Sequence, residues 1–90
     1  MDFEWNSNKE ASNERKHGVS FHEAATVFSD PLAITFDDPD HSTDERRLIT
    51  FGESRFGRLI VVSHTERRES TRIISARPVT RQERRIYEEG

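Results

Sequence analysis

Hydrophobic and polar residues repeat with two different periods along the chain, and the period changes near residue 32. Before that point, the apolar residues from Phe21 to Phe28 follow the i, i+3, i+4, i+7 spacing of an amphipathic helix. After it, short runs rich in β-branched and aromatic residues follow one another, separated by polar stretches. The pattern therefore predicts helices first and strands second.

Three Ser/Thr-x-x-Glu motifs, which begin at Ser7, Ser20 and Thr80, mark expected helix starts. In such a capping box the hydroxyl accepts a backbone N–H and the glutamate reaches back to the cap residue. We expect a first helix over residues 8–17 that ends at Gly18, and a second, short helix that Asp30-Pro31 stops. A third helix is expected over residues 81–87.

Four segments have the length and composition of strands: residues 32–36, 47–51, 58–64 and 71–77. Residues 3–5 are a candidate for a brief edge strand. The short connections favour antiparallel neighbours. The predicted fold class is α+β, with a helical hairpin, a four-stranded antiparallel sheet and a short C-terminal helix in one domain over residues 1–90. The predicted core contains Phe21, Ala25, Phe28, Leu48, Ile60, Val62 and Ile74.

Composition narrows the class of protein. Leu, Ile, Val and Phe make up 20 of 90 residues, so the core is small and a tightly bound partner would stabilise it. Cysteine is absent, which rules out thiolate chemistry and fits a reducing cytoplasm. The longest apolar run, Leu59 to Val62, is far too short for a membrane span, and the acidic N-terminus does not resemble a signal peptide. We expect a soluble, cytoplasmic protein.

The net charge of −3 hides an asymmetry between the two halves of the chain. Residues 1–45 carry 3 basic and 11 acidic residues, whereas residues 46–90 carry 11 basic and 6 acidic ones. Every base of the second half is arginine, whose planar donors match phosphate and carboxylate groups. The second half is therefore either a surface for phosphate or an acidic partner, or a solvated sheet edge.

The common signatures of phosphate loops, zinc proteases, calcium loops and serine hydrolases are absent from the sequence. The run Asp37-Asp38-Pro39-Asp40-His41 holds oxygen and imidazole ligands close together, but turn chemistry is the commoner reason for such a run. We predict neither a metal site nor a cofactor.

The second half also concentrates residues that suit RNA cleavage. One histidine, several arginines and the only tyrosine are expected near the ends of adjacent strands and on the helix that follows. Metal-free cleavage needs a base for the 2′-hydroxyl, an acid for the leaving oxygen and fixed cations for the phosphorane. Each residue also has a purely structural interpretation: His64 as a bonded strand residue, Glu83 as a cap, Tyr87 as an anchor for the last helix.

Several segments resemble the BrnT family of toxins: Phe3-Glu4-Trp5, residues 15–21 with Glu23-Ala24, Asp30-Pro31-Leu32, and residues 72–77 through Tyr87. The resemblance implies a RelE-like fold, a ribonuclease that arrests growth by cutting RNA, and neutralisation by a BrnA antitoxin. BrnA resembles ribbon-helix-helix proteins, so operator DNA would be bound only through the antitoxin. Positions that match the family motifs are His64, Glu66, Arg67, Arg72, Arg77, Glu83 and Tyr87.

We accordingly predict a site between the last helix and the strand ends. Its catalytic residues are His64, Arg77, Glu83 and Tyr87, and its RNA-binding residues are Arg67, Arg72, Arg81 and Arg84. In a regular strand Arg72 and Arg77 point to opposite faces, so only one of these two is expected to reach the RNA directly. We favour Arg77 for that role, with His64 on the neighbouring strand as its partner.

Two other functions remain open. RelE-type toxins are usually basic and this chain is acidic, so it could be a non-catalytic co-repressor that acts with a DNA-binding antitoxin. A plain RNA-binding module is the third alternative, but the second half offers only Phe51, Phe56 and Tyr87 as stacking platforms.

Overall fold

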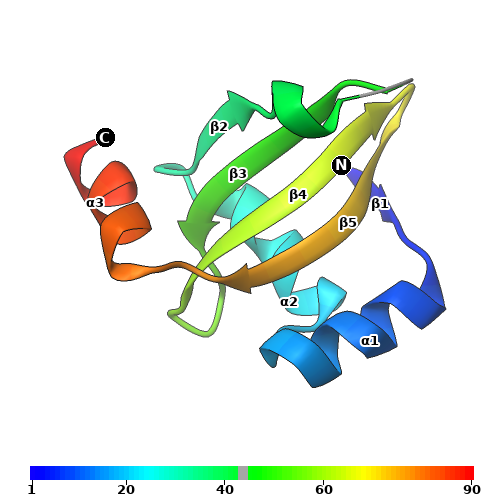
Figure 1. The fold of residues 1–90 in the computed structure, drawn as a ribbon, viewed down its shortest axis with the longest axis horizontal. Coiled ribbons are helices and arrows are strands. Elements are labelled where there is room, and N and C mark those ends of the chain that lie inside the picture. The colour runs from blue at the N-terminus through cyan, green and yellow to red at the C-terminus, as the bar shows by residue number, and fades with distance from the viewer. Residues whose placement is uncertain (43–44) are drawn as a thin grey trace.

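The protein has two layers, a curved sheet and a pair of helices against one of its faces, as Figure 1 shows for a computed structural model that describes residues 1–42 and 45–90. The elements in chain order are β1 (Asp2–Glu4), α1 (Ser7–His17), α2 (Phe21–Thr26), the 3-10 turn η1 (Val27–Ser29), β2 (Ile34–Asp37), the 3-10 turn η2 (Pro39–His41), β3 (Arg47–Glu53), β4 (Leu59–Arg67), β5 (Ser70–Pro78) and α3 (Arg81–Glu89). The predicted α+β class is confirmed.

The sheet has five strands in the order β1-β5-β4-β3-β2, and β1 runs parallel to β5 while the other pairs are antiparallel. The prediction of four antiparallel strands is correct for β2 to β5 but wrong for the sheet as a whole. Phe3 accounts for the fifth strand, because its ring packs on Phe28 with centroids 5.3 Å apart. That contact brings the N-terminal segment along the free edge of β5.

The core lies between the sheet and the helices α1 and α2, whereas α3 stands beyond one end of the sheet (Figure 1). Its fully buried residues are Val19, Phe21, Ala24, Val27, Ile60, Val62, Ile73 and Ala76. The predicted core residues Phe21, Ile60 and Val62 are among them, and Ala25 and Phe28 pack against them in part. Leu48 and Ile74 are only half-buried, so their assignment to the core is wrong. No helix of the described residues is long and apolar enough to cross a membrane.

Helix starts agree with the capping motifs in two of three cases. Thr80 and Glu83 form a complete capping box at α3, and Ser20 accepts the Glu23 N–H at α2. At α1 the cap is Asn6, not Ser7, and its side chain accepts the Lys9 N–H at 3.0 Å. Gly18 ends α1 in the left-handed conformation with φ 71°, as predicted.

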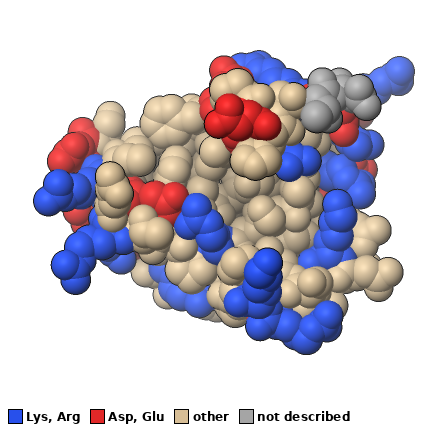
Figure 2. All heavy atoms as spheres, in the orientation of Figure 1, with Lys and Arg blue, Asp and Glu red and all other residues tan. Residues whose placement is uncertain are grey.

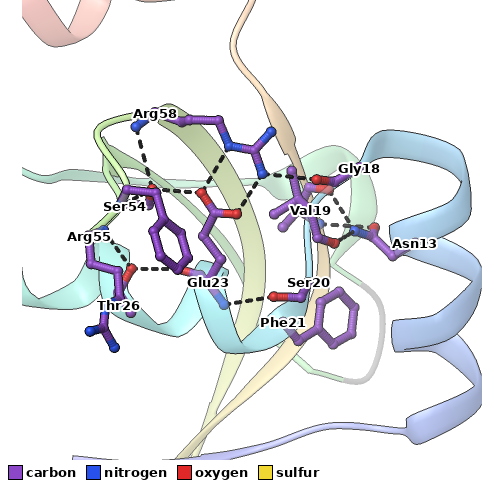
Figure 3. Close-up of polar contacts among 12 residues, drawn as sticks. Asn13, Gly18, Val19, Ser20, Phe21, Glu23, Thr26, Ser54, Arg55 and Arg58 are labelled. Atoms are coloured by element: carbon purple, nitrogen blue, oxygen red, sulfur yellow. Dashed lines mark hydrogen bonds and ion pairs between the residues drawn. The ribbon is translucent and has the colours of Figure 1, made fainter.

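The glutamates of the first two motifs bind distant groups instead of their own caps. Glu10 accepts hydrogen bonds from the Trp5 indole and the Phe21 N–H, so it fastens α1 to the segments on either side. Glu23 is buried, and it accepts from the Ser54 hydroxyl at 2.7 Å and from Arg58 Nε at 3.0 Å (Figure 3). These bonds fix the turn between β3 and β4 against the helix layer.

The strand β2 begins at Ile34, two residues later than predicted. Asp30 explains the delay, because its side chain accepts the Leu32 N–H at 2.9 Å and its carbonyl accepts the Ala33 N–H at 3.1 Å. This Asx-type turn keeps Leu32 out of the ladder and leaves its side chain exposed.

Candidate active site on the open sheet face

The candidate site lies on the face of the sheet opposite α1 and α2, which we call the open face. Cross-strand partners point to the same side of a sheet. The ladder therefore places three rows of side chains on the open face: Arg47, Thr65 and Arg72; then Ile49, Ser63 and Ser75; then Phe51, Val61 and Arg77. The rows lead from a polar end near Arg72 to a hollow near Arg77.

The hollow has a volume of about 180 Å³, and it lies between η2 and the start of α3. Its lining residues are Asp38, His41, Ile49, Phe51, Val61, Ser63, Ser75, Arg77 and Glu83. Figure 2 views this side of the molecule and shows a depression of mostly uncharged atoms, with both basic and acidic side chains around it. An apolar floor with a few converging polar groups is the usual form of a binding site.

A β-bulge in β5 decides which arginines reach this face. Ser63 pairs with Ser75, but His64 pairs with Ile73, so Ile74 is an extra residue without a partner on β4. The alternation of β5 shifts by one residue there. Arg72 and Arg77 consequently point to the same face, and the prediction that they point to opposite faces is wrong because the strand is not regular.

Arg77 and Glu83 form a bidentate pair inside the hollow. The two guanidinium nitrogens donate to the two carboxylate oxygens at 2.8 and 2.9 Å. The hydrogen bond from Arg77 lowers the pKa of Glu83 to about 2, and the pKa of Arg77 is raised in turn. Glu83 also caps α3, so the end of β5 and the start of α3 hold these two predicted site residues together, as expected.

His64, by contrast, lies on the other side of the sheet from Arg77. Its side chain is only 3% exposed, packs edge-on against Phe28 with centroids 4.8 Å apart, and faces the helix layer. Nε2 lies 2.7 Å from the Thr50 hydroxyl, and Nδ1 lies 3.0 Å from the Glu66 carboxylate. Burial lowers its pKa, against the opposing effect of Glu66. The predicted pairing of His64 with Arg77 is wrong, because the strand alternation separates the two residues.

Tyr87 is turned away from the hollow as well. Its hydroxyl donates to Asp30 at 2.7 Å, and this bond raises the pKa of Tyr87 to about 12. The phenol therefore anchors α3 to the segment before β2, which is the structural role considered for it above.

The four arginines predicted to bind RNA are split between two places. Arg67 donates to Glu45 at 2.9 Å, and both Arg67 and Arg72 lie within 4.0 Å of Glu4. Arg81 and Arg84 are exposed on α3, and neither lines the hollow. Of these four, Arg72 is the one that belongs to the three rows of the open face, in the row at their polar end.

The hollow contains a histidine that sequence reasoning assigned only to a turn or a metal loop. His41 is 65% exposed, and its Nδ1 lies 2.9 Å from one oxygen of Asp38 and 3.1 Å from the other. Asp37 pairs instead with Arg46 at 2.6 Å. Within residues 1–42 and 45–90, no three His, Asp or Glu side chains gather as a metal ion would require.

Arg47 and the serines of the open face were also missed. Ser63 and Ser75 are directly paired across β4 and β5, and both residues line the hollow. Alternate residues of the strand over 59–65 point to opposite faces of the sheet, so the sequence indicated that Ser63 shares a face with Leu59 and Val61. It did not indicate which of the two faces the helices cover. In the described part of the chain, Arg47 Nε and Thr65 Oγ1 are buried without a hydrogen-bond partner.

The ion pair of the buried Glu23 with the half-exposed Arg58, on the helix side, is not a second candidate site. Both oxygens of Glu23 accept hydrogen bonds from Arg58, and Arg58 also donates to the Gly18 carbonyl at 2.9 Å (Figure 3). The same carboxylate accepts from Ser54, which leaves it little capacity for a ligand.

Comparison with known proteins identifies the family of the chain. A family model described as the ribonuclease toxin BrnT of type II toxin–antitoxin systems matches residues 5–83. The fold and the match together define a ribonuclease toxin class, and the chain belongs to the BrnT family, as the sequence resemblance implied.

A solved structure of a known toxin is similar to this chain over nearly its whole length. The ribonuclease toxin BrnT of Brucella abortus has 25% sequence identity to this chain and a TM-score of 0.68, over 90% of this chain and 99% of that one. No curated protein matches the sequence.

Proposed function

We propose that the chain is a metal-independent endoribonuclease that arrests growth by cutting RNA bound across the open face. The observation that carries the proposal is the Arg77 guanidinium in the 180 Å³ hollow, between η2 and α3. A fixed guanidinium stabilises the charge that develops on a phosphate during cleavage. From Arg77, the rows that contain Arg47, Arg72, Ser63 and Ser75 extend across the open face as a path for the RNA.

Substitution of Arg77 tests this function. Arg77→Ala should lower the rate of RNA cleavage by the purified protein by about a hundredfold or more, because it removes a preorganised donor. The unaltered protein should retain its rate in excess chelator. Arg15→Ala, an exposed arginine on α1, is the matched control and should cleave normally. Equal rates for Arg77→Ala and the unaltered protein would place the site elsewhere.

The antitoxin is proposed to be a BrnA-type ribbon-helix-helix protein, and operator DNA is proposed to be bound only through it. Membership of a type II toxin–antitoxin family supports a protein partner. The proposed RNA substrate implies action in the cytoplasm. Co-expression of the partner should abolish growth arrest, and the partner protein should co-purify with this chain.

A co-repressor without catalytic activity is the second candidate. The bidentate bond to Glu83 supports it, because that bond neutralises Arg77 in the free protein. A co-repressor would cleave no RNA alone, yet it would strengthen operator binding by its partner. Cleavage by the purified unaltered protein separates the two candidates.

A further inference from the structure

We propose that His41 is the general base of the cleavage reaction and that Asp38 positions it. The inference rests on the proposed ribonuclease function and names the group that activates the 2′-hydroxyl. His41 is the only one of the four histidines that lines the hollow. His64 is buried under Phe28, and His17 and His22 lie on the helix layer.

The turn that carries His41 is tied to the sheet by a series of hydrogen bonds. The Asp38 N–H donates to the Arg47 carbonyl at 2.9 Å, and the Arg47 N–H donates to the Ser42 hydroxyl at 2.9 Å. Ser42 in turn donates to the Asp38 carbonyl at 2.9 Å. Pro39 stands at the first position of η2, where its fixed φ suits the turn. These bonds fix the turn to β3, and the turn places His41 at the rim of the hollow.

The Asp38 carboxylate fixes the form of the ring. A carboxylate only accepts hydrogen bonds, so Nδ1 of His41 carries the proton that it donates to Asp38. In the neutral imidazole Nε2 is then unprotonated and free to accept a proton from a substrate. The same base-and-orienter arrangement is used by catalytic histidines that activate a hydroxyl nucleophile.

The proposed step is a transesterification. His41 Nε2 takes the proton of a ribose 2′-hydroxyl, the 2′-oxygen forms a bond to phosphorus, and the bond from phosphorus to the 5′-oxygen breaks. A water molecule supplies the proton to the leaving 5′-oxygen, and His41 later returns its proton to the solvent. The products are a 2′,3′-cyclic phosphate and a 5′-hydroxyl end. Arg77, across the hollow, binds the non-bridging phosphate oxygens.

Loss of the imidazole tests the proposal. His41→Ala should lower the cleavage rate by roughly a hundredfold or more, while its affinity for a non-cleavable 2′-O-methyl RNA and its unfolding midpoint stay near those of the unaltered protein. Added imidazole should restore part of the rate, which a purely structural residue would not allow. The cleaved ends should carry cyclic phosphate by mass spectrometry.

His22→Ala is the matched control, since His22 is also exposed and its Nδ1 also lies near a carboxylate, Glu10, at 3.2 Å. It should cleave at the normal rate. Asp38→Asn should lower kcat and leave KM unchanged, as expected for a positioning residue. If His41→Ala cleaves as fast as the unaltered protein, the assignment of His41 is wrong and the ribonuclease function stands. If the unaltered protein cleaves no RNA, both the assignment of His41 and the proposed ribonuclease function are wrong.

Discussion

His64 connects four strands through a chain of hydrogen bonds on the helix-covered face. Glu66 only accepts, so Nδ1 of His64 donates to it, and Nε2 of the neutral ring accepts from the Thr50 hydroxyl. Thr50 is then free to accept from Thr35 at 2.8 Å, and Thr71 donates to Glu66 at 3.0 Å. His64 and Thr50, two buried members of this hydrogen-bond series, have all their polar side-chain atoms bonded when the imidazole is neutral.

The buried imidazole predicts a pH dependence of stability. Burial holds the pKa of His64 below its unfolded value of 6.5, so the unfolded chain binds a proton that the folded chain does not. The free energy of unfolding should therefore decrease as the pH falls below about 6.5, by up to about 1.4 kcal/mol between pH 7.5 and 5.5. Urea titrations at both pH values measure this change.

His64→Gln is the matching variant for that measurement, because it removes the titrating group and keeps one donor and one acceptor. It should lower stability at pH 7.5, and it should flatten the change between pH 7.5 and 5.5. The same slope in both proteins would show that another group is responsible. RNA cleavage per folded molecule should stay close to normal, since His64 faces away from Arg77.

At the scale of elements, the sequence predicted those helix ends and strands that are determined by residues close together in the chain. Capping at Ser20 and Thr80, the stop at Gly18 and the strands β3 to β5 depend on local chemistry, and they were predicted to within a few residues. The edge strand expected over residues 3–5 forms as β1, but its parallel pairing with β5 was not predicted, because it depends on long-range packing such as the contact of Phe3 with Phe28.

The candidate site was only half predictable for the same reason. Arg77 and Glu83 are six residues apart around a strand end and a helix cap, so their pairing follows from the local order of elements. The bulge at Ile74 reverses the alternation of β5, and its Ile-Ile-Ser surroundings do not distinguish it from a regular strand. His41 comes from a turn whose position over the sheet depends on the long-range pairing of β2 with β3.

The attachment of the β3–β4 turn to the helix layer yields a second stability prediction. Arg58→Ala should lower the free energy of unfolding by about 2–4 kcal/mol, because it leaves the buried Glu23 carboxylate without its cation. Arg55→Ala, an exposed neighbour in the same turn, should have little effect. Combining Arg58→Ala with Glu23→Gln should recover part of the loss in urea unfolding. A double variant as unstable as the sum of its parts would contradict the coupling.

For the whole molecule, the important electrostatic fact is where the charges lie. The chain is acidic overall, yet its arginine-rich half supplies β3, β4 and β5, and those strands place Arg47, Arg72 and Arg77 on the open face. Some acidic residues of the first half, among them Glu4 and Glu45, lie at one end of that face and pair with its arginines. Net charge therefore does not describe this face, where the charges of Arg72 and Arg77 are partly balanced by Glu4 and Glu83.

This distribution predicts a modest salt dependence of RNA binding. Each phosphate that a cation neutralises on a single strand contributes roughly −0.7 to the slope of log Kobs against log salt concentration. Contacts from Arg47, Arg72 and Arg77 would give a slope of about −2, measured with a non-cleavable 2′-O-methyl RNA. Arg72→Ala should reduce the magnitude of this slope by about 0.7.

Arg15→Ala on α1 is the control for this experiment, because it makes the same change in net charge on the helix layer. It should weaken binding slightly at low salt, through the long-range field, and should leave the slope nearly unchanged. If both variants changed the slope equally, RNA would be bound by the diffuse charge of the molecule and the open face would not be its site. If Arg15→Ala alone changed it, the RNA would lie on the helix layer.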